Sequence, residues 1–108
     1  MGLLDFFKSK DSTQSHQRLL GEWRLIKGDD LENGDGVSVK FLPKGKLIYI
    51  IELKDRQQII NLSFRVDGKY LVTDQPSAHK EEKTKFSFDA KGNLVLQYGG
   101  KRSWFVRV

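Results

Sequence analysis

The stretch Phe64-Arg-Val-Asp-Gly68-Lys-Tyr70 predicts a tight hairpin, and the chain contains its pattern three times. A Phe is followed four residues later by Gly, then by a polar residue and then by a large apolar one. The other copies are Phe41-Leu-Pro-Lys-Gly45-Lys-Leu47 and Phe88-Asp-Ala-Lys-Gly92-Asn-Leu94, so the copies begin 23 and 24 residues apart. Glycine readily adopts the positive φ that short hairpin turns require. The repeat therefore predicts three hairpins, which supply six strands.

Apolar and polar residues alternate around these turns with the period of two that indicates strands. The six strands are expected at 37–42, 46–53, 58–66, 69–73, 83–88 and 93–98. Two more are expected at 19–27 and 103–108, and the Gly-Gly-Lys turn at 99–101 joins the last strand to the one before it. Eight short strands in sequential hairpins predict an all-β, antiparallel up-and-down barrel, because closure buries the apolar face and removes the sheet edges.

The alternation also predicts which side chains point into the barrel, since every second residue of a strand faces the same way. The inward set is expected to be Trp23, Leu25, Val37, Val39, Phe41, Leu47, Tyr49, Ile51, Ile60, Leu62, Phe64, Tyr70, Val72, Phe86, Phe88, Leu94, Leu96, Tyr98, Trp104 and Val106.

Length and composition restrict the class of protein. The chain has 108 residues, 38% of them hydrophobic, which is enough for one core and too apolar for a disordered protein. We expect one barrel domain at 13–108, preceded by an amphipathic segment and linker at 1–12. The absence of cysteine excludes disulfides, thiolate zinc sites, iron–sulfur clusters and cysteine nucleophiles.

Residues 2–8 form a short amphipathic stretch that one turn of helix would turn into an apolar patch. The patch would consist of Leu3, Leu4, Phe6 and Phe7. It either docks on the core of its own domain or frays, or else it contacts a membrane surface or a partner protein. A short helix capped by Thr13 and running into Leu20 is expected next.

The stretch at 1–8 lacks the basic n-region, long apolar core and cleavage site of a secretory signal. Phe6 also stands where a myristoylation motif needs Ser or Thr. Together with the absence of cysteine, these features lead us to expect a cytoplasmic protein.

The net charge of +5 divides into +1 for residues 1–18, −3 for 19–36 and +7 for 37–108. Half of the lysines of the basic part sit beside turn glycines, where lysine commonly keeps strand ends soluble. An anion-binding face is the alternative interpretation. Because the aromatic residues fall on the inward parity, the sequence argues against nucleic acid as a partner. It leaves the oligomeric state open.

Residues capable of catalysis or metal binding are sparse. His16 and His79 have no partner at ligand spacing, and the acidic loop at 29–35 does not fit the EF-hand pattern. Glu81 and Glu82 are adjacent, so on a strand they face opposite ways. No nucleophile motif or phosphate-binding glycine loop occurs. We therefore expect no metal, no cofactor and no enzymatic activity.

Gly21-Glu22-Trp23 on the first strand resembles the Gly-x-Trp signature that opens the lipocalin and wider calycin barrels. Arg107, near the end of the last strand, is similar to the arginine that those families pack over that tryptophan. The run at 19–26, followed by the hairpin repeats, looks like small bacterial lipocalin-like domains. The resemblance covers about residues 15–108 and implies that the barrel binds a small hydrophobic ligand without catalysing a reaction.

Such a ligand needs a cavity of roughly 300 Å³ or more. The candidate ligand-binding residues are Trp23, Tyr49, Phe64, Tyr70, Phe88, Tyr98 and Trp104. The three tyrosine hydroxyls could bond a ligand headgroup, or the rings could simply pack at the barrel mouth. The alternative function is that of a structural or protein-interaction domain, with a filled barrel tethered by residues 2–8.

Overall fold

The computed structural model describes residues 15–29, 36–77 and 80–108. The expected helix cap Thr13, His79, most of the acidic loop and the amphipathic segment with Leu3, Leu4, Phe6 and Phe7 lie outside the described residues.

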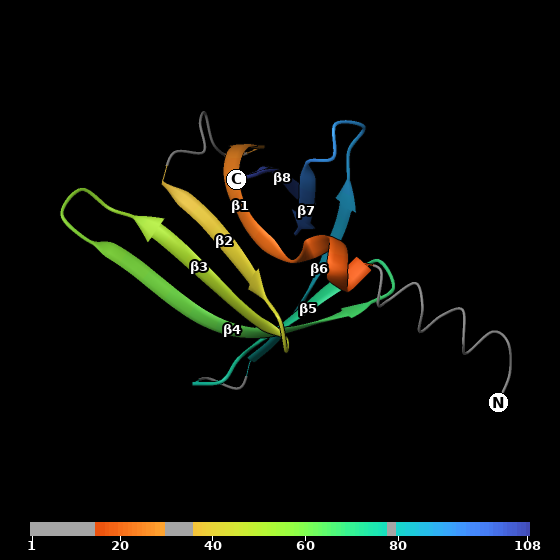
Figure 1. Cartoon of the computed structure of the whole chain (residues 1–108), viewed down its shortest axis with the longest axis horizontal. Coiled ribbons are helices and arrows are strands. Elements are labelled where there is room, and N and C mark those ends of the chain that lie inside the picture. Colours follow the sequence, from red (N-terminus) through yellow and green to blue (C-terminus); the bar gives the residue numbers. More distant parts are fainter. Residues whose placement is uncertain (1–14, 30–35, 78–79) are drawn as a thin grey trace, which may run out of the picture.

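Eight antiparallel strands follow one another in sequence order and close into a barrel, with β8 pairing back onto β1 (Figure 1). The strands are β1 (Gly21–Gly28), β2 (Val37–Leu42), β3 (Lys46–Glu52), β4 (Gln57–Asp67), β5 (Tyr70–Gln75), β6 (Lys80–Phe88), β7 (Leu94–Tyr98) and β8 (Lys101–Arg107). The predicted fold class is confirmed.

The repeated turn glycines have the backbone geometry that the sequence predicted. Gly45, Gly68 and Gly92 have φ values of 75°, 61° and 82°, which are readily reached only without a side chain. Each turn joins consecutive strands, so the first Phe of each copy and the apolar residue after the glycine belong to neighbouring strands. The three hairpins β2–β3, β4–β5 and β6–β7 follow from this pattern.

The core occupies one half of the barrel and is built from the inward residues of all eight strands. Its fully buried side chains include Trp23, Phe41, Leu47, Leu71 and Leu94. Phe41 meets Phe64 edge to face, with ring centroids 5.1 Å apart. Rings in this geometry gain attraction beyond their buried area. This half of the barrel is filled by its own side chains.

The inward parity predicted for β8 is wrong. Phe105, which is 3% exposed, pairs with Leu25 and Leu94 and faces the core. Trp104 and Val106, which were expected inward, therefore face outward. Trp104 pairs with Lys27 and Val95 on the outer surface.

In β5, too, the residues predicted to point inward are the wrong ones. Leu71, which is 1% exposed, belongs to the core, whereas Tyr70 is 45% exposed on the outer face. Val72 faces outward, because its cross-strand partners are Arg65 and Lys83. It is buried but does not belong to the core cluster.

A short helical segment at residues 15–19 lies across one end of the barrel (Figure 1). Leu19, which was expected to begin the first strand, ends this segment and is fully buried. His16 stacks on Phe64 with ring centroids 4.9 Å apart, and the Arg18 guanidinium lies 3.9 Å from the centre of the Phe88 ring. The helical segment thus plugs this end, which we call the closed end.

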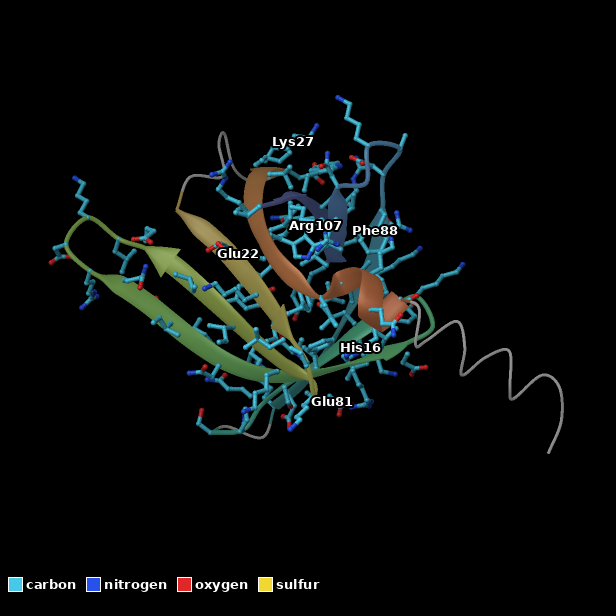
Figure 2. All side chains as sticks on the ribbon, in the orientation of Figure 1. His16, Glu22, Lys27, Glu81, Phe88 and Arg107 are labelled. Atoms are coloured by element: carbon cyan, nitrogen blue, oxygen red, sulfur yellow. The ribbon has the colours of Figure 1, made fainter. Side chains whose placement is uncertain are left out.

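Arg107, labelled in Figure 2, joins the closed end to the strands together with Trp23. The Arg107 guanidinium lies 4.2 Å from the centre of the Trp23 ring and donates hydrogen bonds to the carbonyls of Leu20 and Arg18, at 2.7 and 2.6 Å. The Trp23 indole donates to the carbonyl of Leu19 at 2.8 Å. These donors satisfy carbonyls that a helix end otherwise leaves unpaired. The packing of arginine over tryptophan is the arrangement that the resemblance implied.

Gly21 begins β1 directly beside this cluster. Its φ of 120° is a conformation that side-chain-bearing residues rarely adopt, and a Cβ built there would lie 2.7 Å from Arg107 Nη1. Glycine at this position is therefore required both by the backbone and by the close approach of the guanidinium. In the part of the chain that the structure describes, no helix is long and apolar enough to cross a membrane.

Candidate functional site

The candidate site is a cavity at the other end of the barrel, which we call the open-end cavity. Its volume is about 460 Å³, and six strands, β1, β2, β3, β6, β7 and β8, contribute to its wall. The lining residues are Leu25, Val37, Tyr49, Glu82, Thr84, Leu96, Tyr98, Lys101, Ser103 and Phe105. Side chains therefore fill the closed half of the barrel and leave room in the open half.

The apolar floor of the open-end cavity is the outer boundary of the core. Leu25, Leu96 and Phe105 belong to the core cluster and also line the cavity. They lie on β1, β7 and β8, which are neighbours across the closure of the barrel. A ligand resting on this floor would cover apolar surface that is otherwise in contact with water, and such burial is favourable.

A second hollow of about 280 Å³ adjoins the cavity on the side of β4 and β5. The two share Tyr49, Glu82 and Thr84. Its remaining wall consists of Ile60, Leu62, Leu71, Thr73, Gln75 and Lys80. Polar side chains thus alternate with apolar ones along the shared wall, so this part of the barrel offers hydrogen-bonding groups as well as apolar surface.

Tyr49 and Glu82 are the pair that defines the electrostatics of the shared wall. Burial raises the pKa of the Tyr49 phenol, and the carboxylate of Glu82 raises it further. The phenol therefore stays protonated and can donate a hydrogen bond over the whole neutral range. Glu82 is itself paired with Lys80, whose Nζ lies 3.7 Å from Oε1. A ligand at this wall therefore meets the neutral hydroxyl donor of Tyr49 and the carboxylate of Glu82, whose negative charge is partly balanced by Lys80.

The structure separates the seven predicted ligand-binding residues into three groups. Only Tyr49 and Tyr98 line the open-end cavity. Trp23, Phe64 and Phe88 lie at the closed end, in or against the core beneath the helical segment.

The remaining two, Tyr70 and Trp104, lie on the outer face of the barrel, where they contact neither the core nor the open-end cavity. The aromatic residues therefore do not form the single ligand cage that sequence parity predicted.

Sequence reasoning missed the polar part of the site. Glu82 and Thr84 alternate with outward residues along β6 and share the inward face with Phe86, so the period of two already placed them inside. They were missed because only apolar residues were assigned to the interior. The outward neighbour Glu81 pairs with Arg65 at 3.2 Å, which confirms that the two adjacent carboxylates face opposite ways.

Within residues 15–29, 36–77 and 80–108, no three histidine, aspartate or glutamate side chains gather in a way that could bind a metal ion. His16, the described histidine, is occupied by its stacking on Phe64.

The fold and the cavity together define a lipocalin-like barrel, and comparison with solved structures agrees. A lipocalin-like protein from Bacteroides uniformis superposes with a TM-score of 0.72 at 22% sequence identity, over 84% of this chain and 99% of that one. An uncharacterized protein from Bacteroides eggerthii superposes with a TM-score of 0.68 at 13% identity, over 83% of this chain and 99% of that one. Both likenesses concern the fold. No protein-family model and no curated protein sequence matches this chain.

Proposed function

We propose that this protein binds a small, largely hydrophobic ligand in the open-end cavity, without catalysing a reaction. The observation that carries the proposal is the cavity of about 460 Å³ above the apolar floor of Leu25, Leu96 and Phe105. Pockets for small ligands usually measure about 300–1,000 Å³ and combine an apolar lining with a few placed polar groups. Lipocalin-like folds are typically binding proteins, and the lipocalin-like neighbour supports this class of function.

The polar wall sets the expected orientation of the ligand. Tyr49 and Glu82 stand on the wall shared by both hollows, so a hydroxyl or other donor-bearing group of the ligand would lie there. The apolar part would rest on the floor. This orientation satisfies the polar groups of the ligand and buries its apolar surface, as a bound state requires.

Titration with N-phenyl-1-naphthylamine, an uncharged probe whose emission rises in apolar surroundings, tests the proposal. Saturable binding is expected for the wild-type protein. Thr84→Tyr, which adds a ring to the shared wall, should reduce the affinity at least about tenfold, because it occupies space that the probe needs. Native mass spectrometry of protein purified from its own host then seeks the natural ligand.

Asn61→Tyr is the matched control, since Asn61 is exposed on β4 and its neighbours Ile60 and Leu62 line the second hollow from the inner face. It adds the same ring to the outer surface and should leave probe binding unchanged. Failure of the wild-type protein to bind the probe saturably, or equal loss in the two variants, would contradict a binding site in the cavity. Those results would favour the structural or protein-interaction function instead.

A further inference from the structure

A strip of aromatic and basic side chains crosses the outer face of the barrel over strands β5 to β8. In one cross-strand row Tyr70 pairs with Lys85, Lys85 with Gln97, and Gln97 with Arg102. Their sequence neighbours Leu71, Phe86 and Leu96 are buried in the core, so this row points outward. The row runs over β5, β6, β7 and β8.

Trp104 extends the strip two residues further along β8. Two cations lie near its ring, with Lys27 Nζ 4.6 Å and the Arg102 guanidinium carbon 5.1 Å from the ring centre. Figure 2 shows Lys27 at the end of β1 that lies away from the helical segment. The outer strip therefore consists of Tyr70, Lys85, Gln97, Arg102, Trp104 and Lys27.

The surface along the strip is hollowed. A depression of about 480 Å³ lies over β6, β7 and β8, with Lys85 and Gln97 on one side and Trp104 and Arg102 on the other. Val95 and Ser87 pair with each other and lie in its lining. A flat ring can rest there against the indole while the basic groups remain at the rim.

Positive charge dominates this surface even though two carboxylates lie near it. Asp29 accepts the backbone N–H of Arg102 at 2.9 Å and lies 3.8 Å from its side-chain Nε. Asp89 accepts backbone N–H groups of Lys91 and Asn93, both at 2.9 Å. Both carboxylates are thus already hydrogen-bonded, Asp29 to the facing strand β8 and Asp89 within its own turn.

The charges left facing outward include those of Lys85, Lys27 and the neighbouring strand residue Lys83. They suit a phosphate backbone, because lysines near phosphates release condensed counterions.

We propose that the outer strip binds a short stretch of single-stranded nucleic acid, with one base stacked on Trp104 and the phosphates along Lys85, Arg102 and Lys27. Small β-barrels bind single strands through this combination of aromatic platforms and a basic track. The sequence argued against nucleic acid because all aromatics were assigned to the interior. That premise fails for Tyr70 and Trp104, which face outward.

The spacing of the two outer aromatics fits a short oligonucleotide. Tyr70 on β5 and Trp104 on β8 are three strands apart, which is about 14 Å at the usual inter-strand distance, and a two-residue step along the strand adds about 7 Å at right angles. The rings are therefore about 16 Å apart along the surface. This length is about five base steps at the stacked spacing of about 3.4 Å, so a strand of about six nucleotides covers it. The strip is long enough for a base at each end.

Fluorescence anisotropy of a labelled eight-nucleotide oligothymidine, titrated with the full chain at several NaCl concentrations, tests the proposal. We expect saturable binding at 50 mM NaCl that weakens as salt increases. Trp104→Ala should weaken it by about fivefold or more, because one stacked base is lost, and Trp104→Phe should retain most of the affinity. Lys85→Gln combined with Arg102→Gln should reduce the slope of log K against log salt by about 1.4, since each removed phosphate contact contributes about 0.7.

Lys54→Gln is the matched charge control, because Lys54 is exposed in the β3–β4 connection, outside the strip. It should leave binding within about twofold of wild type. Intrinsic fluorescence gives a second readout: bound oligothymidine should quench the emission of the half-buried Trp104 but not that of Trp23, which is 1% exposed. Trp104→Phe should therefore abolish the quenching while the protein remains folded by circular dichroism.

Three results would overturn the proposal. The first is the absence of binding at 50 mM NaCl, and the second is equal weakening by Lys54→Gln and by the Lys85/Arg102 double variant. The third is binding of vesicles rich in anionic lipid that depends on the same lysines while Trp104→Ala leaves oligothymidine binding unchanged. That result would identify a general anionic-surface contact instead.

Discussion

Replacing Arg107 should open the closed end of the barrel and cost a large share of the stability. Its guanidinium makes two short hydrogen bonds to the carbonyls of Arg18 and Leu20 and packs on the Trp23 ring. Charged hydrogen bonds are worth about 1.5–3 kcal/mol each, and we take about 1 kcal/mol for each because Arg107 is exposed. The cation–π contact adds about 1 kcal/mol. Arg107→Ala should therefore lower the free energy of unfolding by about 3 kcal/mol.

Urea denaturation followed by tryptophan fluorescence measures this change, because Trp23 is buried directly beneath the guanidinium. The loss should also lower Tm by about 12 °C, at about 4 °C per kcal/mol for a domain of this size. Arg107→Lys keeps the charge but not the planar fork, which is needed to reach two carbonyls at once, so it should lose about half as much.

Arg24→Ala is the matched control, since Arg24 is an exposed arginine on the outer face of β1. It should change stability by no more than about 0.5 kcal/mol. Equal stability of Arg107→Ala and this control would contradict the role of Arg107 in holding the closed end. Equal losses for Arg107→Lys and Arg107→Ala would also contradict it, because the retained charge of lysine should preserve part of the contribution.

Three further perturbations have defined outcomes. Gly21→Ala should destabilise by about 1–3 kcal/mol in the same assay, because it forces a positive φ on alanine and brings a methyl group to 2.7 Å from Arg107. Backbone N–H donors of the turn, that of Asn93 above all, lower the pKa of Asp89 below its ordinary value. The contribution of Asp89 to stability is therefore present above about pH 4 and is lost as pH falls through the lowered pKa, and Asp89→Asn should flatten the acid limb of the stability curve. The pKa of Tyr49 is raised, so its effect on stability depends on pH in the opposite direction. Its contribution is present below pH 10 and is lost as pH rises through the pKa of the folded protein. Glu82→Gln should bring that pKa, followed by ultraviolet absorbance, back toward 10.

The hairpin repeat was sufficient to predict the fold because it encodes local geometry. A glycine four residues after a phenylalanine determines where the chain reverses, and the alternation between the turns determines where the strands run. The observed strands begin and end within a few residues of the predicted bounds. Barrel closure followed from the number of strands and the need to bury one face.

The candidate site was harder to predict, because parity within one strand has two solutions when adjacent residues are both large and apolar. Trp104 and Phe105 are such a pair, as are Tyr70 and Leu71. Only the cross-strand register decides which member faces inward. On the β1 side that register also shifts between Leu25 and Lys27, where a bulge interrupts the pairing with β8. A bulge of this kind changes the parity on either side of it, and nothing in the local sequence marks it.

The contact between Arg107 and the residues before β1 also has a consequence for how the chain folds. The other strand pairs join neighbours in the sequence across short connections, whereas the bond from Arg107 to Leu20 spans 87 residues. The entropic cost of closing a loop grows with the logarithm of its length, and for this loop it is about 4 kcal/mol, several times that of a hairpin turn. The hairpins are therefore expected to form first and the β1–β8 seam last. Within the seam, the amide hydrogens at its bulge, between Leu25 and Lys27, should exchange sooner than those of the regularly paired residues on either side.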